Sequence, residues 1–319
     1  MGLWHAHCIA RAGGELAAVC DLEVHAARRL ASRCKGAHAG VRLDEVLAEA
    51  KIDVLHICTP CQTHFELAAA AIRRGIHVLV EKPMTPDCAA TERLYALAAE
   101  HRVLLCPVHQ FPFQRGVRRA VAEAGRIGQL RHFEATFCSA GGAGRSDDEL
   151  DAIVAEILPH PLSLMQCLVP GSPREEGWVV SRPAPGEFRA VLTAGGVCFS
   201  ILISMNSRPT ATALRLLGTA GTIHVDLFHG FCVIEPGGVS RWRKIIHPFD
   251  LATRTLAAAG RNLAGRAWRG EKAYPGLQRL VRDFYRAIAT GTEPPLTAAD
   301  AVLGEKIRAL LIEKWKVTS

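Results

Sequence analysis

The segment Asp53–Pro83, DVLHICTPCQTHFELAAAAIRRGIHVLVEKP, determines the fold predicted for this chain. Asp53–Cys58 and Ile76–Val80 are short apolar runs rich in β-branched residues, which is typical of buried strands. Between them, Gln62–Arg74 spaces its apolar residues as an α-helix does, and Gly75 follows at the expected helix end. Two buried strands joined by one helix predict a right-handed βαβ unit with parallel strands.

Polar residues follow both predicted strands at their carboxyl ends. Thr59-Pro60 comes after the first strand, and Glu81-Lys82-Pro83 comes after the second. Ligands of open parallel sheets bind beyond these ends, so the sequence predicts that Lys82 faces a ligand crevice. The alternative is a surface lysine in a turn.

These residues, in this order, resemble those of the Gfo/Idh/MocA oxidoreductases, which pair a Rossmann domain with a C-terminal α/β domain. The resemblance rests on Thr59-Pro60, His64, Gly75–Leu79 and Glu81-Lys82-Pro83, with support from Gly2–His5, Cys20-Asp21, Gly125–Gly128 and Glu156…His160. It implies an α/β protein with a Rossmann domain over residues 1–110. A C-terminal α+β domain, built on a mostly antiparallel open sheet, is expected over residues 111–319.

The first residues depart from the dinucleotide-binding pattern of strand, G-x-G-x-x-G and helix. Gly2 matches the last glycine of this fingerprint, and His5 matches the family's histidine just after it. The first strand and the first two glycines are absent, which is expected to leave two strands without their shared partner. A misassigned start codon is the favoured interpretation. The alternative is a cofactor-binding or interaction protein without turnover.

Asp21 follows the predicted strand Glu15–Cys20, about twenty residues after the fingerprint. A carboxylate there accepts hydrogen bonds from the ribose hydroxyls and repels a 2′-phosphate, so NAD is expected and NADP is less favoured. Arg28 and Arg29 nearby soften this preference, and a solvated loop carboxylate is the alternative. The cofactor contacts that the resemblance implies are Gly2, His5, Asp21, Thr59, Pro60, His64, Glu81 and Lys82.

Catalysis by an alcohol dehydrogenase needs a base for the hydroxyl proton and a donor that polarises the oxygen. Lys82 is the candidate donor. Glu156 and His160 are spaced i, i+4 and are expected on one face of the helix Asp147–Leu168. The resemblance implies that His160 is the acid/base and that the acid orients or polarises the site, although an aspartate is more usual at position 156. The resemblance implies a reaction that moves a hydride between a nicotinamide and a hydroxyl or carbonyl of a sugar, polyol or sugar nucleotide.

The remaining elements were assigned by hydrophobic periodicity. Further strands are expected at Ala39–Arg42, Val103–Cys106, Leu130–Cys138, Glu187–Ala194, Val197–Asn206, Ala211–Leu217 and Thr222–Phe228. Further helices are expected at Leu3–Arg11, Leu22–Cys34, Asp44–Ala50 with Asp44 as its cap, Asp87–His101, Phe113–Gly125, Tyr274–Ala289 and Thr297–Trp315. The last two are expected to pack back on the first domain, and the open sheet face is expected to form a homodimer or homotetramer.

Phe249–Ala273 has the composition of a basic helical insertion, with five cations beside Leu256, Leu263 and Trp268. A solvated helix face is the simpler interpretation. The alternative is a segment over the substrate cleft that attracts an anionic small-molecule substrate.

Composition excludes several classes of protein. The 319 residues carry a net charge of +7, but the basic residues follow no nucleic-acid-binding motif. No apolar run reaches the roughly 18 residues of a membrane span, and no secretion signal is present, so a cytoplasmic protein is expected. The 11 cysteines lack disulfide spacing. Cys58 and Cys61 have redox C-x-x-C spacing but are interpreted as part of the strand-end motif, and no metal site is predicted.

Overall fold

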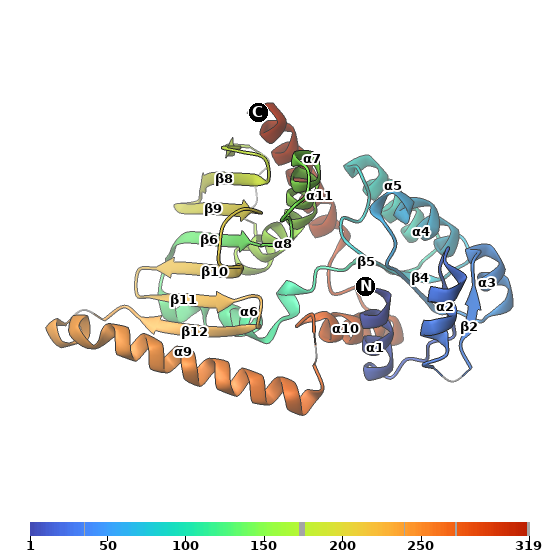
Figure 1. The fold of residues 1–319 in the computed structure, drawn as a ribbon, viewed down its shortest axis with the longest axis horizontal. Coiled ribbons are helices and arrows are strands. Elements are labelled where there is room, and N and C mark those ends of the chain that lie inside the picture. Colours follow the sequence, from blue (N-terminus) through green and yellow to red (C-terminus); the bar gives the residue numbers. More distant parts are fainter. Residues whose placement is uncertain (35, 172–175, 239, 272, 318–319) are drawn as a thin grey trace. The chain divides into compact units, whose positions relative to one another are not determined.

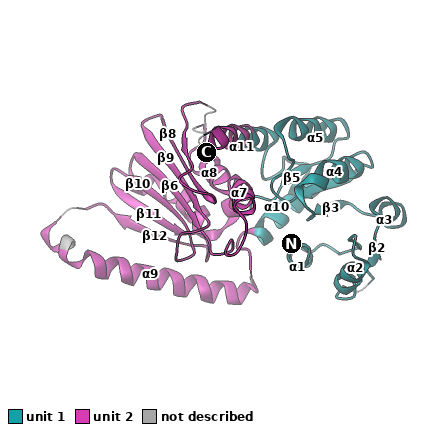
Figure 2. Ribbon diagram, turned by 45° about the horizontal axis from the view of Figure 1, so that its top comes forward, with its two compact units in different colours: residues 1–109, 277–305 teal, residues 110–276, 306–319 magenta. Residues whose placement is uncertain are grey.

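A computed structural model describes residues 1–34, 36–171, 176–238, 240–271 and 273–317 of the chain. The chain divides into two compact units (Figure 2). Unit 1 consists of Met1–His109 and Leu277–Glu305, and unit 2 consists of Gln110–Gly276 and Lys306–Ser319.

Unit 1 contains short parallel strands. They are β1 (Ala18–Cys20), β2 (His38–Gly40), β3 (Val54–Ile57), β4 (His77–Val80) and β5 (Leu105–Pro107) (Figure 1). The predicted βαβ unit is confirmed, because β3 leads through a 3₁₀ turn and α4 (His64–Ile72) into the parallel strand β4. A Rossmann-like unit is therefore present.

The helices of unit 1 follow the predicted order with shifts of a few residues. They are α1 (Gly2–Arg11), α2 (Val24–Ala31), α3 (Leu43–Glu49), α4, α5 (Cys88–Glu100), α10 (Leu277–Thr290) and the first part of α11 (Ala298–Val317). Ala68 and Ile72 of α4 and Leu94 of α5 are buried against Val78 and Leu105 of the strands. The expectation that Asp44 caps α3 is wrong: Arg42 is the N-cap residue, and its guanidinium instead pairs with Asp44 at 2.7 Å.

The parallel strands of unit 1 form two separate sheets within the described residues. One contains β1 and β2, and the other has the order β3-β4-β5. The prediction that two strands lack a shared partner is confirmed, since β1 and β3 each have a strand neighbour on one side. Backbone groups on such edges need other partners or water. Helix α1 packs against α10 in this unit.

Unit 2 is built on a sheet of seven strands in the described residues, in the order β12-β11-β10-β6-β9-β8-β7. Their bounds are β6 (Leu130–Cys138), β7 (Val179–Ser181), β8 (Glu187–Ala194), β9 (Val197–Ser204), β10 (Ala211–Gly218), β11 (Gly221–Asp226) and β12 (Phe231–Pro236). All neighbours are antiparallel except β6 and β9. The predicted mostly antiparallel sheet is confirmed, and β7 and β12 are strands that the sequence analysis missed.

Alternate residues of the central strands build the core of unit 2. Phe133 of β6, Phe199 and Ile201 of β9 and Leu214 of β10 are all buried. Helices α6 (Arg115–Ala122), α7 (Asp147–Ile157), α8 (Pro159–Leu168) and α9 (Arg241–Arg269) complete the unit. At Gly116 of α6, a Cβ atom would lie only 2.8 Å from the backbone of β12, so this close approach requires glycine.

The predicted single helix Asp147–Leu168 is wrong. Helix α7 ends at Ile157, and α8 begins at Pro159 with Leu158 between them. Proline lacks an N–H donor, and its ring clashes with the carbonyl four residues earlier, so Pro159 ends α7 and begins a new helix. The basic insertion is confirmed as helical, but α9 begins at Arg241 rather than Phe249 and runs for 29 residues, through Pro248.

The end of α11 is fixed to the sheet of unit 2 by one aromatic residue. The indole N–H of Trp315 donates to the carbonyl of Glu187 at 3.0 Å, and its ring meets Phe188 edge-on at 5.8 Å between centroids. The guanidinium of Arg182 lies 5.7 Å from the same ring. Trp315 is 3% exposed, so it belongs to the core of unit 2.

We expect Trp315→Ala to destabilise unit 2 by about 3–5 kcal/mol through the cavity it leaves. Trp315→Phe should cost about 1 kcal/mol, since one hydrogen bond is lost while most of the packing is kept. Urea unfolding measures both. Val317, 80% exposed on the same helix, gives the control Val317→Ala. Equal unfolding midpoints for wild type and Trp315→Ala would show that α11 does not hold the sheet.

Candidate active site

Predicted site residues of unit 1 lie directly after its parallel strands. Asp21 follows β1, Thr59-Pro60 follows β3, and Glu81-Lys82 follows β4. The alternation of strand and helix places them at carboxyl ends, because each strand is followed by a return helix. This is the edge at which open parallel sheets bind ligands.

His5 of α1 makes a buried hydrogen-bonded contact with two other elements of unit 1. Its Nε2 lies 3.0 Å from Oε1 of Glu81, beyond β4, and its Nδ1 lies 2.8 Å from Nδ1 of His56 on β3. His56 continues the network, with its Nε2 2.9 Å from the hydroxyl of Tyr285 on α10. Since His5 lies in the first turns of α1, these contacts hold the amino end of α1 beside the carboxyl end of β4.

The charges in this network follow from its geometry. Burial disfavours a charged His5 ring, but hydrogen bonds to Cys58 and Glu81, with their charges, outweigh burial and raise the pKa of His5 to about 9. Burial, together with the charge on His5, lowers the pKa of His56 well below its usual value. His5 is therefore an imidazolium that donates to Glu81 and His56. Neutral His56 accepts at Nδ1 and donates from Nε2 to Tyr285.

Glu81 connects this network to Lys82, the candidate donor residue. The backbone N–H of Lys82 donates to Oε2 of Glu81 at 3.3 Å, so the carboxylate bridges α1 and the loop that carries Lys82. Burial, followed by the positive charge of Lys82, lowers the pKa of His109 to about 4. Lys82 thus sets a positive field at the carboxyl edge of β4 and keeps His109 neutral.

His64, at the start of α4, joins the loops after two neighbouring strands. Its Nε2 lies 2.8 Å from the carbonyl oxygen of Thr59, and its Nδ1 lies 3.0 Å from that of Pro83. The ring is 1% exposed. His64 therefore packs at the start of α4 and fixes the spacing of the two loops.

Asp21 is exposed after β1, and its Oδ1 accepts from the backbone N–H of Glu23 at 2.9 Å. Burial, together with the charges of Asp21, Asp44 and Glu45, raises the pKa of Cys20. The carboxyl end of β1 is thus an acidic environment built from the residue after β1 and the first turn of α3.

His160 begins α8 in unit 2 and is 8% exposed. Its ring lies 4.5 Å from that of Phe111, edge-on, and 6.3 Å from that of Phe137, stacked at 12°. The hydroxyl of Ser163 donates to its carbonyl oxygen at 2.9 Å. The ring is therefore held in place by aromatic neighbours.

Glu156 does not share a helix with His160, which corrects the predicted i, i+4 pair. Glu156 is exposed near the end of α7, and the break at Leu158 separates it from buried His160. The structure brings His5, Glu81 and Lys82 together within unit 1, with Thr59 and His64 joined to the same loops. His160 and Glu156 lie in unit 2, and Gly2 begins α1 without any contact that singles it out.

His56 and Tyr285 are functional candidates that sequence reasoning missed. A histidine inside the apolar strand VLHI was the available signal, because a buried imidazole needs a partner. Tyr285 lies 229 residues away and carried no such signal. Across the described residues, no group of three or more His, Cys, Asp or Glu side chains is placed to hold a metal ion.

Comparison with known proteins adds to this geometry. Residues 3–109 match the family model GFO_IDH_MocA, an oxidoreductase family with an NAD-binding Rossmann fold. The family model therefore matches the N-terminal part of the chain. The resemblance inferred from the strand-end motifs is confirmed, and the GFO_IDH_MocA match spans the strands and loops that carry them.

Relatives of this chain include named dehydrogenases and reductases. The scyllo-inositol 2-dehydrogenase (NADP(+)) IolU of Bacillus subtilis (strain 168) is 29% identical over 230 residues, which are 67% of this chain and 69% of that protein. The dTDP-3,4-didehydro-2,6-dideoxy-alpha-D-glucose 3-reductase of Streptomyces violaceoruber is 29% identical over 253 residues, 72% of each chain. These similarities support a hydride-transferring oxidoreductase and give no support to a protein without turnover.

The fold has solved counterparts over nearly its whole length. UDP-N-acetylglucosamine 3-dehydrogenase GnnA from Acidithiobacillus ferrooxidans matches with a TM-score of 0.74 and 21% identity, over 99% of this chain and 95% of that chain. At this identity the match establishes the fold of both units and nothing finer.

We expect unit 1 to lose stability as pH rises from about 6.5 to 9. The folded pKa of His5 lies above its unfolded value of 6.5, so its stabilisation is complete below pH 6.5 and is lost as pH rises through about 9. Below pH 6.5, the lowered pKa values of His56 and His109 act in the opposite direction. Thermal unfolding measured against pH follows both the upper limb of this profile, above pH 6.5, and its lower limb, below pH 6.5.

His5→Gln should flatten the upper limb of this profile while leaving the lower limb in place. The exposed His25 on α2 gives the matched control His25→Gln. If wild type and His5→Gln lose stability equally between pH 6.5 and 9, the imidazolium of His5 does not hold the network.

Proposed function

We propose that this chain is an NAD(P)-dependent dehydrogenase or reductase acting on a sugar, polyol or sugar nucleotide. The observation that carries the proposal is the His5–Glu81–Lys82 connection, which fixes a lysine at the carboxyl end of β4 beside the amino end of α1. The relatives named above, an inositol dehydrogenase and a deoxysugar nucleotide reductase, support the substrate class.

The residues of unit 1 fit a dinucleotide. The free N–H groups at a helix amino end favour a pyrophosphate, and the His5 contacts hold this end of the ten-residue α1 at the strand edge. Gly2, Thr59, Pro60 and His64 are the proposed neighbours of the cofactor, with His5 and Glu81 positioning the loop. A bound nicotinamide would accept or supply the hydride at this edge.

The protein groups handle the proton and the oxygen. Lys82 donates a hydrogen bond to the substrate oxygen and stabilises the negative charge that develops on it when the hydroxyl proton leaves in oxidation, or when hydride adds to the carbonyl carbon in reduction. His160 takes the hydroxyl proton in oxidation and returns it in reduction, since imidazole titrates near neutrality. Glu156 is proposed to orient a polar group of the substrate from α7.

NAD is the proposed preferred cofactor. The negative charges of Asp21, Asp44 and Glu45 lie near the end of β1. Burial is the largest cause of the raised pKa of Cys20, and these three charges raise it further. A 2′-phosphate brought to this environment would meet Coulomb repulsion. Arg28 and Arg29, in the last turn of α2, act against this preference.

A homo-oligomer is proposed from the open face of the unit 2 sheet. Leu202 of β9 and Leu217 of β10 are only partly buried within a single chain. No helix in the described part of the chain is long and apolar enough to cross a membrane. A cytoplasmic enzyme is proposed on the basis of its metabolic relatives.

We expect Lys82→Ala and His160→Ala each to lower kcat by roughly two to four orders of magnitude, as for a positioned acid/base group. NAD affinity should change little in either variant. Lys51→Ala and His132→Ala, at exposed positions, are matched controls. If His160→Ala keeps its kcat and loses thermal stability instead, His160 is a packing residue between Phe111 and Phe137.

We expect Asp21→Ser to weaken NAD binding and strengthen NADP binding, so that their ratio shifts by roughly tenfold or more, equivalent to about 1.4 kcal/mol. The variant removes a ribose acceptor and a negative charge together. Nucleotide titration followed by fluorescence gives both dissociation constants. Tighter binding of NADP than NAD by the unaltered protein would contradict the proposed preference.

A further inference from the structure

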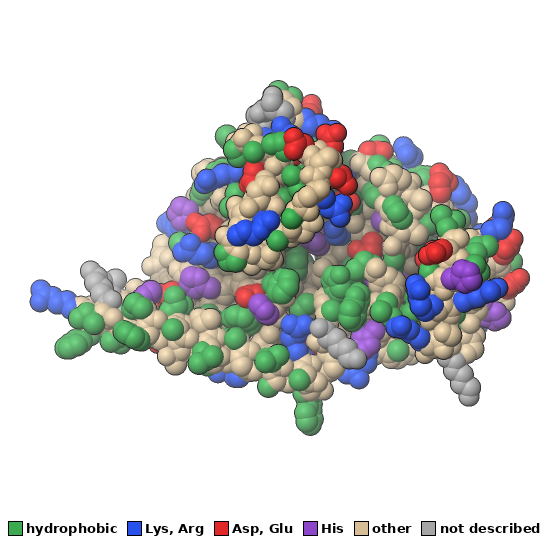
Figure 3. Space-filling view, in the orientation of Figure 1, with side chains coloured by type: hydrophobic (Ala, Val, Ile, Leu, Met, Phe, Trp, Pro, Cys, Tyr) green, Lys and Arg blue, Asp and Glu red, His purple; other side chains and the backbone are tan. Residues whose placement is uncertain are grey.

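Helix α9 presents an apolar stripe to solvent. Its large apolar side chains recur on one face, with Trp242, Phe249, Leu256 and Leu263 spaced seven residues apart. Ile245 and Ile246 extend the stripe. The exposed fractions are Trp242 75%, Ile245 63%, Ile246 50%, Phe249 75%, Leu256 76%, Leu263 70% and, beside the stripe, Trp268 92%. Figure 3 shows hydrophobic side chains along this edge of unit 2.

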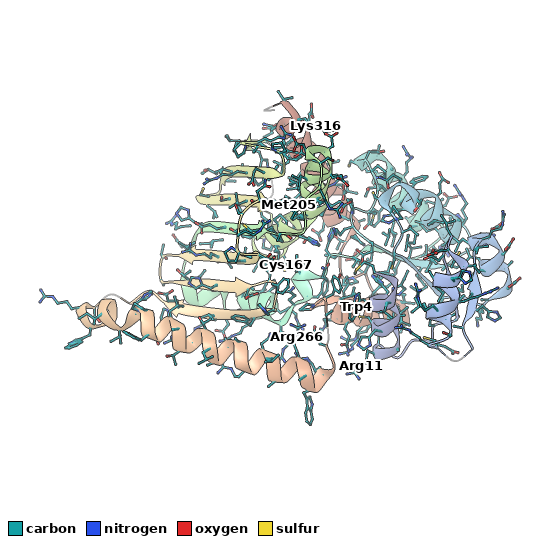
Figure 4. The ribbon with its side chains drawn as sticks, viewed as in Figure 1. Trp4, Arg11, Cys167, Met205, Arg266 and Lys316 are labelled. Carbon is teal, nitrogen blue, oxygen red and sulfur yellow. The ribbon has the colours of Figure 1, made fainter. Side chains whose placement is uncertain are left out.

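The opposite face of α9 is already taken up by polar contacts within unit 2. The side chains of Asn262 and Arg266 donate to the carbonyl oxygen of His229, at 2.9 and 3.3 Å (Arg266 is labelled in Figure 4). His247 pairs with Glu235 of β12. Helix α9 runs along β12 at the edge of the sheet (Figure 1). These contacts fix the rotation of α9 about its axis, so the stripe stays exposed to solvent.

The rest of the α9 surface is basic. Among the α9 residues whose side chains the structure describes, five are arginines and one, Asp250, is acidic. Asp250 is paired with Arg254 at 2.8 Å. Arg261, two turns further, is exposed on the same flank. A helix with tryptophan and leucine on one face and arginine on its polar face has the composition of helices that lie in the headgroup region of a bilayer.

The alternative occupant, a second copy of α9, fits this face poorly. Paired helices need two rows of large apolar residues, and here the second row contains Ala252, Ala259, Gly260 and Ala267 over its C-terminal part. A second copy would also bring like charges together. An anionic bilayer instead complements the arginines and accepts an apolar stripe without a matching row.

We propose that α9 is a membrane-surface helix, which lies in the plane of an anionic bilayer and inserts its Trp242–Leu263 stripe at the level of the headgroups. The ~43 Å length expected for a helix of 29 residues gives one extended contact. This peripheral contact differs from a membrane span and does not depend on the proposed reaction. It would hold unit 2 at a lipid surface.

The test is co-sedimentation of the full chain with vesicles of equimolar phosphatidylglycerol and phosphatidylcholine, compared with vesicles of phosphatidylcholine alone. We expect stronger binding to the anionic vesicles, which salt weakens. Phe249→Glu/Leu256→Glu should reduce this binding by about tenfold or more, because charges replace inserted apolar groups. The matched control is Leu22→Glu, at an apolar position in unit 1 that is 94% exposed.

A second pair of variants tests the charge. Arg254→Gln/Arg261→Gln should weaken binding to anionic vesicles by about fivefold per arginine, since each basic residue near the surface contributes about 1 kcal/mol. Arg73→Gln/Arg74→Gln, at exposed positions in unit 1, removes the same charge elsewhere. A blue shift of tryptophan fluorescence on vesicle binding should be lost in Trp242→Phe/Trp268→Phe, although that variant still sediments.

Equal sedimentation of wild type with both vesicle types, or equal binding by Phe249→Glu/Leu256→Glu, would overturn the proposal. So would a wild-type dimer, by analytical ultracentrifugation, that ignores vesicles and becomes monomeric in this double variant. That result would identify the stripe as an interface between two copies of the chain.

Discussion

Unit 1 depends on one buried ion pair, between His5 and Glu81. Its two sheets in the described residues share no strand, so backbone hydrogen bonds do not join β1 to β3. The His5 imidazolium instead connects α1 to the loop after β4 and, through His56, to β3 and α10. A buried charge without a partner would be strongly unfavourable. The network is therefore stable only when His5, Glu81 and His56 are all in place.

Local hydrophobic patterns were sufficient to predict most of the elements. The βαβ segment and strands such as Leu130–Cys138 were found because their apolar periodicity is set by the strand or helix itself. The break at Leu158 was missed, although Pro159 signalled it, because the apolar spacing continues across it. Strand β7 was missed because three residues are too few to show a period.

The candidate site was predictable by position but not by environment. The family resemblance proposed Lys82 and His160 as site residues from their places in the chain. It gave no account of the Phe111 and Phe137 rings around His160, or of Tyr285, because these partners are brought together by tertiary packing. Likewise, the sequence showed that α9 is basic and amphipathic, but the direction of its apolar face depends on Asn262, Arg266 and the strand edge they meet.

The interleaving of the two units has a consequence for biosynthesis. Residues 1–109 leave the ribosome before Tyr285 does, yet His56 finds its hydroxyl partner only when Tyr285 has been made. The core of unit 2 is likewise incomplete until Trp315 has been made. Neither unit corresponds to one continuous stretch of polypeptide, so the usual order of co-translational folding, with the N-terminal domain completed first, is closed to this chain. Both units can be completed only after α10 and α11 have been made, and until then His56 lacks its hydroxyl partner.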